Sequence, residues 1–202
     1  MHGRITFWFE FASTYSYLSA MRIGEAAAAR GVLVTWKPFL LGPVFAAQGW
    51  DTSPFDLYPA KGRYMWRDLE RISAARGLPF RRTDPFPQNS LRAARLALAA
   101  TAPGGVEAFS KAVFRAEFGC GADISSEAVL LDCLRQAGLD PALLERAEAP
   151  EIKSALRAQT DAAIAAGIFG APSFTSGTEL FWGDDRLEQA LEHAAGHSAG
   201  IA

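Results

Sequence analysis

Ser13 is the side chain whose type and position are best suited to chemistry in this sequence. It follows an aromatic run at residues 7–11 and precedes a helix-forming stretch, so a strand should turn at Ala12-Ser13 and continue as a helix. The first backbone N–H groups of a helix lack partners and carry partial positive charge, which favours an anion such as a thiolate. Ser13 is therefore either a simple N-cap or a hydrogen-bond donor to a bound thiolate. With no histidine or second cysteine close to it in sequence, Ser13 lacks an evident base and is not expected to be a nucleophile.

Three other stretches carry residues that could hold a ligand. Pro172 starts a strand directly after Ala171. A cis peptide bond between them would leave the Ala171 backbone free to pair with an extended peptide ligand. The alternative is a trans proline that simply ends a loop. Asp184 and Asp185 lie at the start of a helix, where they either form an acidic cap or bind the ammonium group of a ligand. Lys61 lies at a helix start, where it opposes the dipole, and it either meets a ligand carboxylate or is simply solvated.

The elements that would position these residues follow the order βαβ, a run of helices, then ββα. Strands are expected over 4–11 and 32–36 around a helix over 13–29, which makes the two strands parallel with a right-handed crossover. Strands return over 172–176 and 179–182 as a hairpin before a last helix. Between these halves, residues 40–59 form a loop with short helical turns. Helices are then expected over 60–77, 90–102, 107–118, 125–138, from 140, and over 150–166.

This order is that of a thioredoxin fold with a large helical insertion. We therefore predict an α/β protein in which residues 1–38 and 167–202 form a thioredoxin-like domain. Residues 39–166 are expected to form an all-helical insertion domain.

Composition excludes several classes of function. The net charge is −2 with no block of basic residues, which argues against nucleic-acid binding. No segment approaches the roughly 20 apolar residues of a membrane span. The N-terminal stretch is charged early, at Arg4, and enters a probable strand at once, so we expect no secretory signal and a cytoplasmic protein.

Cysteines and histidines point away from thiol and metal chemistry. Cys120 and Cys133 are far apart and form no Cys-x-x-Cys pair, so we expect two free thiols in a reducing compartment. His193 and His197 share a helical spacing, but the glycine between them and the small residues that follow favour a fraying tail, so no metal is expected.

Taken together, four stretches resemble the 2-hydroxychromene-2-carboxylate isomerases and, more distantly, the kappa-class glutathione transferases, both within the DsbA-like thioredoxin superfamily. The stretches are residues 10–18, 59–64, 169–174 and 182–187. Each motif is weak alone, but their shared order and spacing are specific. The resemblance implies a DsbA-like thioredoxin fold with a helical insertion, a homodimer, and glutathione as the bound thiol.

The resemblance also implies roles for individual residues. Ser13 matches the family serine that hydrogen-bonds the glutathione sulfur, and Ala171 matches the residue whose backbone pairs with the cysteinyl unit. Asp184 and Asp185 match the pair that meets the γ-glutamyl head, and Lys61 matches a lysine at the glycyl end. The expected glutathione-binding set is therefore Ser13, Lys61, Ala171, Pro172, Asp184 and Asp185.

Two positions depart from the family pattern. Thr14 stands where the family usually has proline, and Trp50 stands where many members have an asparagine that touches glutathione. A threonine can start a helix, so the first change should be tolerated, whereas the second alters the loop near the substrate. Tyr15, Trp50 and Tyr64 are the residues we expect in the pocket for a small aromatic substrate.

The implied activity is a glutathione-dependent isomerisation. A thiolate adds to a conjugated double bond, the adduct rotates about the resulting single bond, and elimination restores the double bond in the other geometry. Two alternatives stay open: a kappa-class-like transferase that releases the adduct, and a non-catalytic DsbA-like module that binds peptides at the Pro172 strand. A thiol–disulfide oxidoreductase is disfavoured because residue 13 is serine and no resolving cysteine follows.

Overall fold

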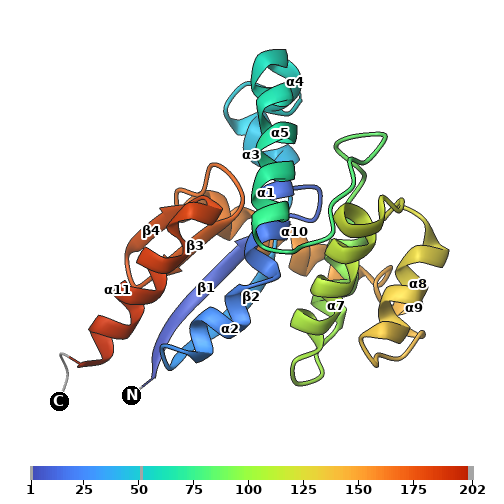
Figure 1. Cartoon of the computed structure of the whole chain (residues 1–202). Helices are drawn as coiled ribbons and strands as arrows, with labels where there is room; N and C mark the ends of the chain where they lie inside the picture. The colour runs from blue at the N-terminus through green and yellow to red at the C-terminus, as the bar shows by residue number, and fades with distance from the viewer. Residues whose placement is uncertain (1, 51, 200–202) are drawn as a thin grey trace.

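The chain folds around one four-stranded mixed sheet, in a computed structural model that describes residues 2–50 and 52–199 (Figure 1). The first elements are β1 (Gly3–Phe9), α1 (Thr14–Ala20), α2 (Ile23–Ala28), β2 (Val32–Pro38), α3 (Leu41–Ala47), α4 (Pro54–Leu57), α5 (Pro59–Ala75) and α6 (Leu91–Ala99). They are followed by α7 (Gly105–Phe114), a π-helical turn η1 (Arg115–Gly119), α8 (Glu127–Gln136), α9 (Leu143–Arg146), α10 (Pro150–Ala165), β3 (Ser173–Ser176), β4 (Glu179–Trp182), a 3-10 turn η2 (Asp184–Arg186) and α11 (Leu187–Ala199). The strand order is β2-β1-β3-β4, with β1 parallel to β2 and antiparallel to β3. The predicted βαβ and ββα halves are confirmed.

β1 is a central strand because its side chains are apolar toward both faces of the sheet. Phe7 is fully buried and stacks on Phe174 of β3, its partner in register, with ring centroids 5.4 Å apart. Trp8 points to the opposite face, where it packs in a second apolar cluster that includes Ala163 of α10. Both faces of the strand are therefore covered, as its near-continuous apolar run predicts.

The stretch between the two halves consists of helices and their connecting loops, with no strand among its described residues, and its helices pack in different places. In Figure 1, α4 and α5 lie at the end of the sheet where β1 leads into α1, while α7, α8 and α9 gather on one side. α10 differs, because its Ala163 packs under the sheet against Trp8. The division of the chain at residues 38 and 166 therefore stays a proposal, with α10 contributing directly to the core of the sheet.

Local structure departs from the sequence-based expectation at three points. The helix expected over 13–29 breaks into α1 and α2, because Arg22 leaves helical geometry at φ −124° and turns its guanidinium toward Asp184 and Glu188. The helix expected over 107–118 ends as the π-turn η1, which brings Glu117 into the core. The first strand ends at Phe9 rather than residue 11, and β2 extends to Pro38, which lies opposite Phe9 in register.

Candidate functional site

One large cavity, of about 1100 Å³, gathers the residues that the sequence singled out. Its wall is made by the start of α1, by α3 to α5, by the connection before α6, and by the loops that flank β3 and β4. The predicted site residues in this wall are Ser13, Tyr15, Trp50, Lys61, Ala171, Pro172, Asp184 and Asp185. Residues more than 150 positions apart in sequence thus meet around one space.

Tyr64 is the predicted pocket residue that the structure places elsewhere. Its side chain belongs to α5 but is 61% exposed and lies against Arg71, whose guanidinium carbon is 5.6 Å from the ring centroid. Lys61, Asp68 and Ile72 form the side of α5 that lines the cavity. The prediction for Tyr64 was wrong, because a family likeness places a residue on a helix without saying which face it occupies.

Ser13 lies at the junction between β1 and α1 with its hydroxyl fully engaged. Its backbone is extended, with φ −89° and ψ 113°, and its Oγ accepts the Ser16 N–H at 3.2 Å as the N-cap of α1. The same Oγ donates to the Ala171 carbonyl oxygen at 3.0 Å. The capping role is confirmed, and the hydroxyl proton is directed at the loop that precedes β3.

The peptide bond between Ala171 and Pro172 is cis, which is the first of the two possibilities that the sequence left open. The expectation that the Ala171 carbonyl would be free was wrong, because this oxygen accepts the Ser13 hydroxyl. The loop is held by further internal bonds: Ser173 Oγ donates to the Gly170 carbonyl at 2.8 Å, and the Gly183 N–H donates to the Pro172 carbonyl at 3.0 Å. Two loops that carry predicted site residues are therefore tied together.

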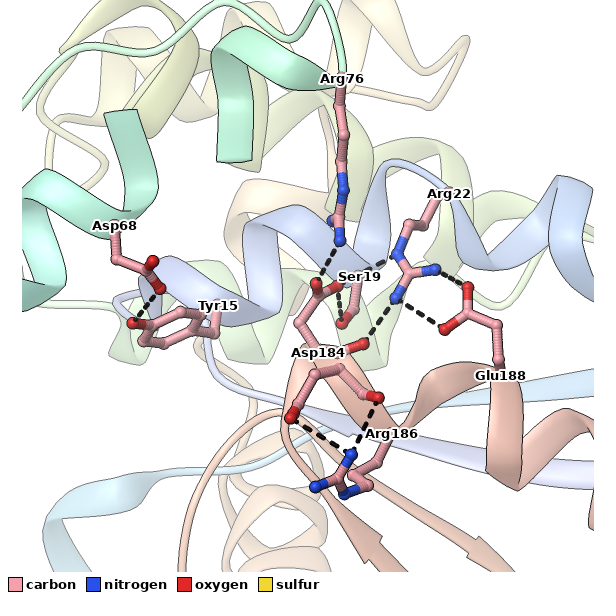
Figure 2. A network of polar contacts seen from close by, with 9 residues as sticks. Tyr15, Ser19, Arg22, Asp68, Arg76, Asp184, Arg186 and Glu188 are labelled. Atoms are coloured by element: carbon pink, nitrogen blue, oxygen red, sulfur yellow. Dashed lines mark hydrogen bonds and ion pairs between the residues drawn. The ribbon is translucent and has the colours of Figure 1, made fainter. Parts of the chain in front are cut away.

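Asp184 and Asp185 have different environments despite being neighbours. Asp184 is only 4% exposed and accepts from Ser19 Oγ at 2.9 Å, Arg22 Nε at 3.1 Å and Arg76 Nη2 at 2.7 Å (Figure 2). Both of its carboxylate oxygens are thus bonded within the protein. The Asp185 side chain is 73% exposed, and its carboxylate lies 3.4 Å from Arg186 Nη1.

Lys61 and Tyr15 complete the predicted polar residues of the cavity wall. Lys61 is exposed, and its Nζ lies 4.7 Å from the centroid of the Tyr58 ring. The Tyr15 hydroxyl donates to Asp68 Oδ2 at 3.0 Å, and burial together with this carboxylate raises the pKa of Tyr15 (Figure 2). The cavity wall therefore combines apolar residues with charged ones.

Several residues of the cavity were missed from the sequence. Phe169 and Trp182 form an aromatic pair with ring centroids 4.9 Å apart, and both line the cavity while staying largely exposed. Arg186 and Glu10 also line it. The only signal for Glu10 was an acidic residue inside an apolar run, and nothing in the sequence distinguished Arg186 from other surface cations.

Glu10 is the most perturbed carboxyl group in the cavity wall. It is 5% exposed, and its Oε1 has no hydrogen-bond partner among the described residues. Burial raises the pKa of Glu10 to about 7, although the Ser90 side chain and the backbone N–H groups of Ala12 and Phe11 favour the charged form. This group therefore changes charge near neutral pH.

Comparison with known proteins places the chain in a family. The description that matches is a DSBA-like thioredoxin domain, over residues 4–195. This chain belongs to the DSBA-like thioredoxin family. It is similar to the 2-hydroxychromene-2-carboxylate isomerase of Sphingobium xenophagum, with 31% identity over 190 residues that cover 93% of this chain and 96% of the relative. The glutathione S-transferase kappa 1 of Homo sapiens is 26% identical over 207 residues, which cover 95% of this chain and 90% of the relative.

The solved structures agree with the sequence relatives. A 2-hydroxychromene-2-carboxylate isomerase structure superposes with a TM-score of 0.85 at 27% identity, covering 98% of this chain and 99% of that one. The thioredoxin-like, DsbA-like fold and the family resemblance are thereby confirmed. Among the described residues, no helix is long and apolar enough to cross a membrane, and no group of three or more potential metal-ligating side chains occurs.

Proposed function

We propose that this protein is a glutathione-dependent isomerase of the 2-hydroxychromene-2-carboxylate type, and that it works in the cytoplasm as a homodimer. The observation that carries the proposal is the Ser13 hydroxyl, which is held against the Ala171 carbonyl in the wall of the large cavity. Relatives at 30–31% identity bear this isomerase name, which supports the reaction class. A kappa-class-like transferase is the competing activity, because relatives with that name are also similar over nearly the whole chain.

The polar groups of the cavity fit the chemistry of the tripeptide. Lys61 offers a cation for a carboxylate, and the exposed Asp185 offers a carboxylate for the ammonium of the γ-glutamyl head. Asp184 is less suited to bind that ammonium, because its two carboxylate oxygens already accept hydrogen bonds from Arg22 and Arg76. We therefore assign the head group to Asp185 and give Asp184 the task of fixing the local backbone.

Ser13 and Ala171 would act together at the sulfur. Bound glutathione supplies a thiolate that adds reversibly to a conjugated double bond and so permits rotation about it. The Ala171 carbonyl can accept a ligand N–H, and the Ser13 hydroxyl, which has one proton, can then turn from that carbonyl to the sulfur. The apolar and aromatic wall, which includes Trp50, excludes water from this bond and strengthens it.

Replacement of Ser13 by alanine tests this assignment. Glutathione binding is followed by isothermal titration, and the pKa of the bound thiol is followed by thiolate absorbance as a function of pH. A hydrogen bond to a charged group contributes roughly 1.5–3 kcal/mol, so Ser13→Ala should raise the bound thiol pKa by about 1–2. Ser16→Ala is the matched control, because the Ser16 hydroxyl is buried, has no hydrogen-bond partner among the described residues, and lies outside the cavity wall.

The outcomes separate the competing functions. Absence of glutathione binding at millimolar concentration would remove both the isomerase and the transferase. An unchanged thiol pKa in Ser13→Ala would remove the role given to Ser13. Incubation with a trans-benzylidenepyruvate should return isomerised substrate, whereas accumulation of a stable glutathione conjugate would favour the transferase.

A further inference from the structure

We propose that the Glu10 carboxylate is the proton acceptor of the site: it takes the thiol proton when glutathione binds and returns it when glutathione leaves. This inference rests on the proposed function and adds a group that the relatives' names do not assign. Ser13 can stabilise a thiolate, but a hydroxyl cannot remove the thiol proton at neutral pH. A thiol that ionises in the site gives its proton either to solvent or to a nearby base, and the described part of the cavity wall contains no histidine to act as that base.

The position of Glu10 suits this role. It directly follows β1, and its backbone carbonyl accepts the Ser13 N–H at 3.1 Å, so both residues belong to one tight turn. Glu10 lines the same cavity as Ser13 and Ala171. The unpartnered Oε1 is an acceptor that the protein itself does not satisfy, which is unusual for a buried carboxyl group.

The electrostatic setting of Glu10 makes proton exchange feasible. Burial raises its pKa to about 7, so near neutral pH both charge states are accessible. A negative thiolate beside the carboxyl group would favour the protonated form further. The other charged groups of the cavity wall are Lys61, Asp68, Asp184, Asp185 and Arg186.

Glu117 is the second buried carboxyl group near Glu10, and it behaves differently. It lies in η1, is fully buried, and both of its oxygens lack a hydrogen-bond partner among the described residues. Burial, with added contributions from Glu10 and Asp123, raises the pKa of Glu117 well above its usual range. Glu117 does not line the cavity, so its carboxyl group is not placed to exchange a proton with the ligand.

The proposed step conserves atoms and electrons. The S–H bond of the thiol breaks, the sulfur keeps the electron pair, and the proton forms an O–H bond with Glu10. No oxidant or reductant is involved. When the ligand leaves, the O–H bond of Glu10 breaks and the proton returns to the sulfur.

Proton release on glutathione binding tests this step independently of activity. Calorimetric titrations in buffers of different ionisation enthalpy count the protons released. At about pH 6 Glu10 is already protonated, so the wild-type protein should release about one proton to the buffer on binding glutathione. At about pH 8 Glu10 takes the thiol proton, so the release should fall toward zero. In Glu10→Gln the release should no longer decrease between these pH values. Glu117→Gln is the matched control, because it changes a buried carboxyl group outside the cavity and should follow the wild type.

Isomerase activity supplies a second measurement. Loss of a general base typically reduces rates by about a hundredfold or more, so Glu10→Gln should reach that loss while Glu117→Gln stays within about twofold of wild type. A urea midpoint of Glu10→Gln at or above that of wild type would exclude misfolding as the cause. If Glu10→Gln binds glutathione with the wild-type pattern of proton release, the proton-acceptor role is overturned and the proposed isomerase stands. If the wild type does not bind glutathione, both fail.

Discussion

Replacement of Glu10 by glutamine should stabilise the fold at alkaline pH and leave it nearly unchanged at acidic pH. The Glu10 carboxyl group is 5% exposed, and burial raises its pKa from 4.5 to about 7. A carboxyl group whose pKa is raised in the folded state opposes folding once it ionises. Its destabilising effect is absent below the pKa of the unfolded chain, grows as pH rises, and is complete above the pKa of the folded state.

The size of the effect follows from the pKa difference. Each pKa unit is worth about 1.4 kcal/mol, so the rise of the Glu10 pKa to about 7 corresponds to about 3 kcal/mol. Glutamine has nearly the same shape and carries no charge at any pH. The difference in free energy of unfolding between Glu10→Gln and wild type should therefore increase by about 3 kcal/mol between about pH 4.5 and pH 8.

Urea unfolding followed by tryptophan fluorescence at several pH values measures this difference. Glu192→Gln is a suitable control. The Glu192 side chain lies exposed on α11, so the substitution removes a carboxylate that water already solvates. A difference between Glu10→Gln and wild type that is constant with pH would refute the reasoning, since the charge of Glu10 would then not be buried in the folded state. A decrease with pH would mean that the carboxylate is stabilised rather than desolvated.

Two further predictions address the ion network and the cysteines. Asp184→Asn should lower the free energy of unfolding by about 2–3 kcal/mol, because it removes the buried carboxylate that Arg22 and Arg76 share and leaves Arg22 with Glu188 alone. A urea-measured loss under about 0.5 kcal/mol would contradict this structural role. A double replacement of Cys120 and Cys133 by serine should retain glutathione binding and isomerase activity in steady-state assays, because neither thiol lines the cavity. A complete loss of activity in a folded double variant would revive a thiol mechanism.

The fold could be predicted from the sequence because its signals are local. The apolar run of β1, the helix ends and the Pro172 strand are each visible in a few adjacent residues, and the structure agrees with them. The break at Arg22, whose guanidinium donates to Asp184 162 positions away, was not visible in the neighbouring residues. Where local residue types agree with the long-range packing, prediction succeeded, and where a distant partner decides the geometry, it failed.

The sequence singled out residues that the structure brings to one cavity, but it did not distinguish their environments. Asp184 and Asp185 are identical in type and adjacent in sequence, and only the arginines that converge on Asp184 separate a buried anchor from an exposed carboxylate. Tyr64 was placed in the pocket wrongly, because side-chain direction on α5 depends on which face the helix turns inward. The environment of Glu10 required the packing around it, including Ser90 from a segment 80 positions away.

The single proton of the Ser13 hydroxyl has a consequence for ligand selection. In this structure that proton is donated to the Ala171 carbonyl, so a ligand atom receives it only if it is a better acceptor than a peptide oxygen. A neutral thiol sulfur is a weak acceptor, whereas a thiolate forms a charge-assisted bond. The hydroxyl should therefore stay with the carbonyl beside a thiol and move to the sulfur beside a thiolate. Ser13 would thus discriminate between two protonation states of one ligand more strongly than between ligands of different size.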